Sequence, residues 1–266
     1  MNLHSIPALM MSAVCLYVAF YYFIMYSLRR HERGYLTFAL SCLSVFIYDI
    51  TCAGLYNANN IEAGVFWQRG NFISTSLVSV SLVWFISDFT NSRIGKRATA
   101  LTLYFLVMIP FFIFTDTGLL LTAANPSIKQ IKIDSLINIT YYEADPGIFC
   151  TVFLLVTIFT FIYMILILVR YNRINKDRRA IKIIVSFCIF FAGVFNDILV
   201  SSGVYNFIYI SEYIFMYILM IMGYALYIKF VELQQEVENL NINLEHKIAE
   251  RTIELIEKQY KTTRRK

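Results

Sequence analysis

The chain has 266 residues, of which 58% are hydrophobic and only 15% are charged. About 25% of the residues of a typical soluble domain carry a charge, so this composition excludes an ordinary soluble protein and indicates a multi-pass membrane protein. The formal net charge is +5, but the basic residues are spread over separate loops, and this spread argues against a nucleic-acid-binding surface.

Seven apolar segments are long enough to cross a membrane. A helix needs roughly 20 residues to span the hydrocarbon core. Backbone groups in lipid must pair with one another, so apolar runs of this length predict helices. The predicted spans cover about 6–28, 35–57, 66–89, 99–115, 147–169, 181–202 and 209–229. The predicted fold is therefore an all-α membrane protein with a seven-helix transmembrane bundle. The first segment lacks the basic start of a signal peptide and is interpreted as the first span.

The Lys and Arg residues indicate which side of the membrane each loop faces. Only Arg69, Lys129 and Lys132 lie on one side of the predicted spans. The other twenty of the 23 basic residues lie on the opposite side, in loops 29–34, 90–98 and 170–182 and in the tail from Lys229. The positive-inside rule predicts that the N-terminus is outside and the C-terminus is cytoplasmic.

One long outer loop, 116–146, has the pattern of a β-hairpin. Its segment "IKQIKIDSLINITYYEADPG" alternates apolar and polar residues around Asp134–Ser135, which favours two strands with a turn at these residues, ending before Pro146. A hairpin alone is only marginally stable in water, so we expect it to pack on the helix ends as a lid. The alternative is an irregular loop.

Four ionisable residues within the spans are candidate functional residues. Such residues are costly in a membrane and usually face the interior of the bundle. The predicted orientation places all four in the outer half, where aromatic and amide side chains accompany them. The candidate set is Asp49, Arg69, Asp197 and Glu212, with Tyr48, Trp67, Asn71 and Asn196. Two interpretations are open: a ligand pocket beneath the hairpin, or helices held together by Arg69 paired with Asp49 or Asp197.

The sequence does not predict a catalytic or metal site. The three histidines, His4, His31 and His246, form no metal-ligand pattern, and no Gly-rich nucleotide loop occurs. We therefore expect no enzyme activity, metal or cofactor in this chain. The five cysteines are interpreted as buried small hydrophobic residues. A disulfide between Cys52 and Cys150 is the alternative.

The residues after the last span predict a cytoplasmic coiled coil over 230–266, following a sensor domain over 1–229. Apolar residues recur at alternating steps of three and four, which favours a parallel dimer. Two consecutive steps of four then form a stutter, which locally unwinds a coiled coil and suits a switch between two packings. The predicted seam is Phe230, Leu233, Val237, Leu240, Leu244, Ile248, Arg251 and Leu255. The alternative is an amphipathic tail on the inner leaflet.

The segment "LEHKIAERTIEL", 244–255, resembles the signalling helix that joins membrane sensors to the output domains of bacterial histidine kinases and diguanylate cyclases. The residues that carry this resemblance are Leu244, Glu245, Lys247, Glu250, Arg251, Thr252, Glu254 and Leu255. The segment "FWQRGNFISTSLVSVSLVWFISDFT", 66–90, and the pair Pro146–Gly147 resemble the seven-helix N-terminal region of such kinases. The segments "FNDIL" and "YALYIKFVEL" also resemble related seven-helix receptors with diverse intracellular signalling modules.

This resemblance implies a sensor in the bacterial inner membrane that passes a stimulus to an output domain absent from the chain. The expected output is a histidine kinase, in cis or in trans, with a diguanylate cyclase second. The expected partners are the lipid bilayer, a second copy of the chain and an unknown small ligand. The alternatives are a stand-alone transducer, a small transporter, or a retinal protein. A retinal protein needs a lysine in the middle of the seventh span, whereas Lys229 lies at the end of that span.

Overall fold

The computed structural model describes residues 2–92, 95–133 and 137–263. It divides into two units, Met1–Gly223 and Tyr224–Lys266. The seven helices are α1 (Ser5–Leu28), α2 (Arg33–Tyr56), α3 (Ile61–Phe89), α4 (Lys96–Phe114), α5 (Ile148–Asn175), α6 (Arg178–Ser201) and α7 (Ser211–Thr263). All seven are long and apolar enough to cross a membrane, so the predicted seven-helix fold is confirmed.

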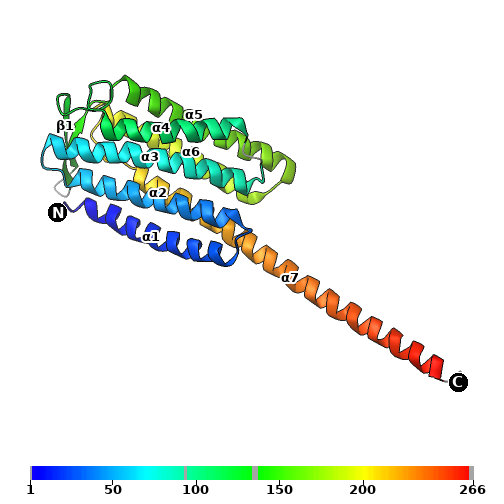
Figure 1. Ribbon diagram of the computed structural model, residues 1–266. Helices are drawn as coiled ribbons and strands as arrows, with labels where there is room; N and C mark the ends of the chain where they lie inside the picture. Colours follow the sequence, from blue (N-terminus) through cyan, green and yellow to red (C-terminus); the bar gives the residue numbers. More distant parts are fainter. Residues whose placement is uncertain (1, 93–94, 134–136, 264–266) are drawn as a thin grey trace. The chain divides into compact units, whose positions relative to one another are not determined.

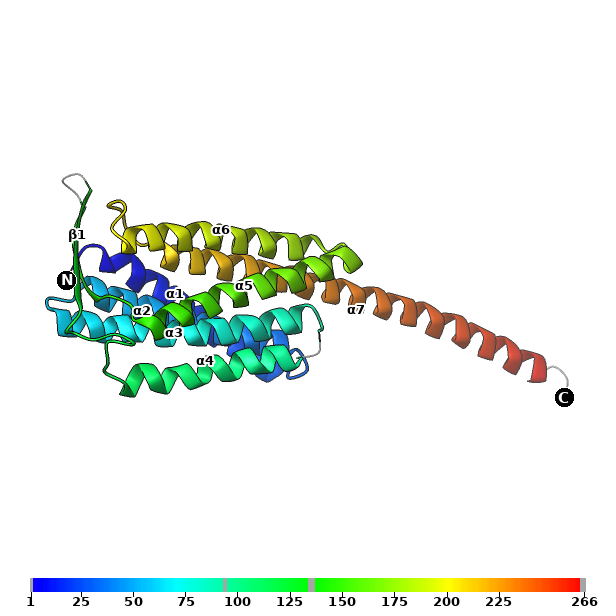
Figure 2. The same ribbon diagram turned by 90° about the horizontal axis from the view of Figure 1, so that it is seen from above.

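Helices α2 and α3 form the centre of the first unit. In their most apolar stretches 61% and 56% of the residues are buried, against 22% for α1 and 17% for α4. Figures 1 and 2 show the helices of this unit side by side, and Figure 2 shows α4 at one flank. The large apolar side chains exposed on α1 and α4 include Phe20 and Phe114, and they suit contact with lipid.

Helix α3 begins five residues earlier than the predicted third span. Asn60 is extended, and its side-chain carbonyl accepts a hydrogen bond of 2.8 Å from the Ala63 backbone N–H. This contact caps the helix in the usual way. The hydropathy pattern placed the start at Phe66 because Glu62, Ala63 and Gly64 lower the hydropathy of the first turn.

The loop between α4 and α5 forms the predicted hairpin, which excludes the irregular-loop alternative. Strands β1 (Pro126–Ile133) and β2 (Ile137–Ala144) are antiparallel, with Ile131 opposite Ile139. The predicted turn at Asp134–Ser135 lies outside the described residues. Side chains alternate between faces along a strand, and Ile139, Tyr141 and Glu143 are all buried. One face of the hairpin therefore packs on the bundle.

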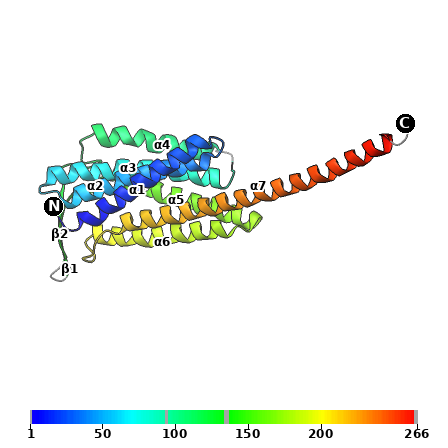
Figure 3. The same ribbon diagram turned by 90° about the horizontal axis from the view of Figure 1, so that it is seen from below.

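The hairpin covers one end of the first unit, which we call the hairpin end. The same end holds the start of α1, the α2–α3 connection and the α6–α7 connection, as the three ribbon views agree (Figures 1, 2 and 3). A hydrophobic cluster joins these segments. Its buried members are Ala8, Cys52, Ala53, Leu55, Tyr56, Ile131, Ile139, Tyr141 and Val200, and Tyr48, Trp67, Ile208 and Tyr209 pack against them. The hairpin thus shares a core with α1, α2 and the residues before α7.

A second cluster fixes the position of the chain between α4 and the hairpin. It combines α3, α4 and α5 with the loop residues Leu120 and Leu121, which are both buried. Phe72 of α3 stacks on Phe112 of α4, with ring centroids 5.1 Å apart. This packing holds the chain entering the hairpin against the first half of α3.

The five cysteines are all described, and each has a free thiol. The alternative, a Cys52–Cys150 disulfide, is therefore absent from the structure. Cys52 lies in the cluster at the hairpin end, whereas Cys150 packs in the cluster of α3, α4 and α5. Four of the five are buried, as the small-hydrophobe interpretation requires, and Cys188 on α6 is exposed.

The second unit comprises the described residues of α7 from Tyr224. Helix α7 runs from Ser211 to Thr263 without a break, as expected from the lack of Gly and Pro after Gly223. The seam residues Val237, Leu240, Leu244, Ile248 and Leu255 are all exposed in the single chain. The structure thus leaves the apolar seam uncovered from Val237 to Leu255.

Gly64 provides a test of the docked hairpin. A Cβ atom at this position would lie 1.7 Å from the Tyr142 backbone carbonyl oxygen, a clash that no side-chain rotation relieves. We expect Gly64→Ala to displace the hairpin, lower the unfolding free energy by about 1–3 kcal/mol, and speed tryptic cleavage at Lys129. Thermal unfolding and limited proteolysis in detergent measure both effects.

The matched control is Gly118→Ala, where the nearest atom to a new Cβ is the Asn125 side-chain nitrogen at 3.4 Å. This variant should behave as the parent protein does. Equal cleavage of the two variants would contradict close docking of β2 on α3.

Candidate functional site at the hairpin end

The first turn of α7 is held by a carboxylate from α6. Asp197 accepts hydrogen bonds from the backbone N–H groups of Ile210, at 2.9 Å, and Ser211, at 3.1 Å. It also accepts one from the Ser211 hydroxyl. The first N–H groups of a helix have no partner within the helix, and a negative charge favours this end of the helix dipole. Asp197 therefore ties the start of α7 to α6.

Asn196 holds the segment between α6 and α7 in place. Its side-chain nitrogen donates to the Asp197 carboxylate at 2.8 Å and to the Ile208 backbone carbonyl at 3.2 Å. Its side-chain oxygen accepts from the Tyr205 hydroxyl. The adjacent residues Asn196 and Asp197 thus fix both the connection and the helix that follows it.

Glu212 ties the same turn of α7 to α2. Its side chain accepts a hydrogen bond from the Tyr56 hydroxyl, and the residue is 2% exposed. Tyr56 lies in the cluster under the hairpin and contacts Tyr141 of β2, with ring centroids 5.7 Å apart. The start of α7 is therefore linked to the hairpin as well as to α2 and α6.

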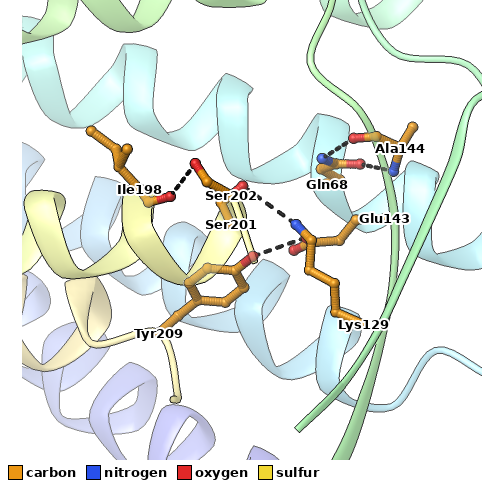
Figure 4. A network of polar contacts seen from close by, with 8 residues as sticks. All are labelled: Gln68, Lys129, Glu143, Ala144, Ile198, Ser201, Ser202 and Tyr209. Atoms are coloured by element: carbon orange, nitrogen blue, oxygen red, sulfur yellow. Dashed lines mark hydrogen bonds and ion pairs between the residues drawn. The ribbon is translucent and has the colours of Figure 1, made fainter. Parts of the chain in front are cut away.

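A third carboxylate, Glu143, joins the hairpin to the residues before α7 (Figure 4). It pairs with Lys129 of β1 at 3.2 Å and accepts a hydrogen bond of 2.9 Å from the Tyr209 hydroxyl. Lys129 also donates to the Ser201 hydroxyl at 3.4 Å. Tyr209 lies two residues before α7, so this network connects the hairpin to that helix.

Gln68 of α3 holds the end of β2 by two hydrogen bonds, which Figure 4 also draws. Its side-chain nitrogen donates to the Ala144 carbonyl, and its side-chain oxygen accepts from the Ala144 N–H, both at 2.9 Å. The amide thereby replaces a neighbouring strand at the edge of the hairpin and satisfies both backbone groups.

Burial controls the protonation of the groups in this network. The pKa of Glu143 is raised above its ordinary value, because loss of hydration outweighs the opposing effects of Lys129 and Tyr209. Burial also raises the pKa of Tyr209 well above its usual range, and the nearby Glu143 raises it further. The Tyr209 hydroxyl therefore stays protonated and can donate to Glu143.

The remaining sequence-predicted residues do not converge on one pocket. Arg69 pairs with Asp116 at 2.6 Å and donates to the Leu121 carbonyl at 2.9 Å. The predicted pairing of Arg69 with Asp49 or Asp197 is therefore wrong. Arg69 lies near the start of α3, and its long side chain reaches the chain that follows α4. The Asp116 side chain is 71% exposed, so this ion pair contributes little stability.

Asp49 and Tyr48 lie on α2. The Tyr48 ring packs against Phe215 of α7, with centroids 5.0 Å apart. Asp49 is fully buried, and neither carboxylate oxygen has a hydrogen-bond partner among the described residues. An unpaired polar group is costly at such a site, so Asp49 is a locally destabilising residue.

Asn71 and Trp67 contact α2. The Asn71 side-chain oxygen accepts from the Thr51 hydroxyl and lies 3.8 Å from the Cys52 sulfur. The Trp67 ring lies against Gly54, where a Cβ would approach it to 2.2 Å. Trp67 also lines a hollow of about 400 Å³ at the hairpin end. Of the eight predicted residues, Trp67 alone lines this hollow.

Sequence analysis missed Lys129, Glu143 and Tyr209. The alternation of the second strand could have predicted that Glu143 is buried. Glu143 follows Ile139 and Tyr141 at the two-residue period of the face that packs on the bundle. A carboxylate on the buried face of a hairpin requires a partner. The identity of that partner, Tyr209, depends on the path of the α6–α7 connection.

Within the described residues, no group of three His, Cys, Asp or Glu side chains could hold a metal ion. In the family comparison, residues 7–229 match the N-terminal seven-transmembrane region of histidine kinases. A search of curated proteins found no match. The family match covers the bundle and the hairpin and ends next to Phe230, the first residue of the predicted seam.

Glu143 predicts a pH dependence of stability. Its pKa in the folded protein lies above its ordinary value of 4.5, so the folded protein binds this proton more tightly than the unfolded chain does. The stabilising contribution is fully present below pH 4.5 and is lost as the pH rises through the folded pKa. The melting temperature of the parent minus that of Glu143→Gln should therefore fall as the pH rises from 4.5.

The variant Lys129→Met is the companion measurement for this pH series. Lys129 lowers the pKa of Glu143, so removing it should move the loss of stability to higher pH. A melting-temperature difference that grows with rising pH would contradict the assignment.

Proposed function

The chain belongs to the family of N-terminal seven-transmembrane regions of histidine kinases, and on that premise we propose that it passes a stimulus received at the hairpin end through α7 to a cytoplasmic coiled coil. An output domain then responds to the coil. In this proposal the hairpin end faces the outside of the bacterial inner membrane. The asymmetry of the twenty basic residues supports this orientation.

The observation that carries the proposal is the set of contacts at the first turn of α7. Asp197 binds two N–H groups and one hydroxyl of this region. Glu212 connects it to α2, and Tyr209 connects it to the hairpin through Glu143. A stimulus that shifts the hairpin or α2 therefore changes the contacts of the helix that leads into the coil.

The energy needed for such a shift is small. A ligand moves a two-state equilibrium only by its difference in affinity for the two states. About 5.5 kcal/mol takes a population from 1:99 to 99:1, and a partial response needs less. The loss of two or three buried hydrogen bonds, each about 1–3 kcal/mol when one partner remains unsatisfied, covers this range.

The proposed receiver of the signal is a parallel homodimeric coil built on the exposed seam of the second unit. Apolar residues at the a and d positions of a heptad pair with the same residues of a second copy. The stutter after Leu244 gives this coil two packings of similar energy. The proposed output domain is a histidine kinase, joined in cis or supplied in trans.

The role of the α7 contacts can be tested in a chimaera. Residues 1–255 are joined in heptad register to a soluble kinase output domain, and autophosphorylation is measured in membranes. Asp197→Asn replaces one acceptor oxygen by an N–H₂ group facing the Ser211 N–H. We expect a loss of about 1–3 kcal/mol in this contact, and hence a severalfold change in basal kinase activity.

The control is Asp49→Asn, because the Asp49 oxygens have no hydrogen-bond partner among the described residues. Its activity should stay within about twofold of the parent, since no contact is lost. Four glycines inserted after Glu238 should interrupt the helix and abolish the effect of Asp197→Asn. Unchanged activity in a folded Asp197→Asn chimaera would disprove transmission through this turn.

The proposed dimer can be tested by cross-linking in native membranes. Single cysteines at Leu240 and Leu244 should form disulfide-linked dimers, because facing seam positions lie in contact in a parallel coil. The background carries Cys188→Ala, since this thiol is exposed. Cysteines at the off-seam positions Asn241 and Glu245 are the controls, and equal cross-linking at all four positions would argue against the seam.

A further inference from the structure

The hollow at the hairpin end has walls of a kind that suits a small molecule. It has a volume of about 400 Å³ and lies between the first turns of α1, the end of α2 and the start of α3. Small-molecule sites fall in the range of about 300–1,000 Å³ and are mostly apolar, with a few polar groups that orient the ligand. Small residues create the space, among them Ala53, Ala58 and Ala63.

Trp67 forms the aromatic wall of the hollow. Its ring lies directly on the α2 backbone at Gly54, where a Cβ atom would approach the ring to 2.2 Å. Leu9 of α1 and Ile50 of α2 complete the apolar walls. A flat or aliphatic group in the hollow would therefore meet an aromatic ring and branched side chains.

Three asparagines of the α2–α3 connection supply the polar part of the lining. Asn57 is already bonded, because it accepts from the Asn2 N–H and donates to the Ala53 carbonyl, both at 2.7 Å. Asn60 uses its oxygen to cap α3. Within the described part of the chain, the Asn59 amide and the Asn60 amide nitrogen make no hydrogen bond. Donors and an acceptor thus remain available beside an apolar wall.

None of the residues that line the hollow is charged. A charged group transferred into such a site would lose hydration without gaining an ion pair, so the lining discriminates against ions. We propose that this hollow binds an uncharged amphipathic molecule, with its apolar part against Trp67 and its hydrogen-bonding group at Asn59 and Asn60. This inference rests on the proposed sensor function and identifies the class of ligand.

The position of Trp67 couples the hollow to α7. Trp67 packs against the buried cluster that also receives Tyr209 and Ile208 from the residues before α7. The same cluster contains Tyr56, which binds Glu212. A ligand that moves Trp67 therefore acts on the side chains that hold the first turn of α7.

The chain offers its own reporter for this site, because it contains only two tryptophans, Trp67 and Trp84. Trp84 lies elsewhere on α3 and donates to the Thr102 hydroxyl at 3.0 Å. The full chain carrying Trp84→Phe, in nanodiscs of one zwitterionic phospholipid, is titrated with octanamide while Trp67 emission is recorded. We expect a saturable change in emission. The ions octylammonium and octanoate should bind at least about tenfold more weakly, since each loses hydration in a neutral site.

A second titration distinguishes a ligand from the membrane from a soluble ligand. In it dioleoylglycerol, an uncharged lipid, is mixed into the nanodisc bilayer. A saturable change with this lipid assigns the site to a membrane component. A change with octanamide alone assigns it to a soluble molecule. Either result supports the proposal, and no saturable change with either probe would overturn it.

Substitutions locate the response in the hollow. Ala63→Phe fills the space and should weaken octanamide binding at least about tenfold, whereas Ala100→Phe, on an exposed site of α4, should not. Asn59→Ala should weaken it by about threefold to tenfold, the effect of one hydrogen bond. The Trp67→Phe protein, which retains Trp84, controls for effects on the bilayer. Unchanged binding in Ala63→Phe, or equal binding of the charged probes, would overturn the proposal. Failure of the kinase chimaera alone would leave this binding result intact.

Discussion

The arrangement of the hairpin end depends on one constraint: the first N–H groups of α7 need acceptors at a place where water is largely excluded. Asp197 accepts from the N–H and the hydroxyl of Ser211, the first residue of α7, and from the N–H of the preceding Ile210. Asn196 then positions Asp197 and the preceding connection. The hairpin follows the same logic, because Gln68 satisfies both backbone groups of Ala144. The start of α7 and the end of β2 are thus each fixed by a polar side chain that belongs to another element.

The buried carboxylates differ in whether their oxygens have hydrogen-bond partners. Asp197, Glu212 and Glu143 each have partners on a different helix or strand, whereas Asp49 has none among the described residues. Breaking a paired buried group leaves its partner unsatisfied and costs about 1–3 kcal/mol. Contacts of this size are concentrated around the start of α7. They allow a small displacement of the hairpin to change the free energy of that helix.

The sequence predicted the seven helices and the hairpin because each depends on a local pattern. Apolar length defines a span, and alternation defines a strand. The side-chain partners depend on non-local geometry. Arg69 was expected to meet Asp49 or Asp197, but the path of the chain after Phe114 brings Asp116 to it instead. Tyr209 as the partner of Glu143 depends likewise on how the α6–α7 connection folds over Val200. Trp67 was named as a candidate pocket residue but Asn59 and Asn60 were not, because these two lie in the connection between the second and third predicted spans and the candidates were sought within and beside the spans.

The apolar seam begins where the family match ends. The match ends at residue 229, and the apolar seam begins at Phe230. Within the second unit, Val237, Leu240 and Leu244 remain more than half exposed. A regular stripe of large apolar residues exposed to water indicates an interaction surface. A second copy of the same helix suits this stripe, because its own residues recur at the same spacing and present the same face. Under the proposed function, pairing of two copies covers this stripe, and it is the step through which a rotation of α7 becomes a change that an output domain can distinguish.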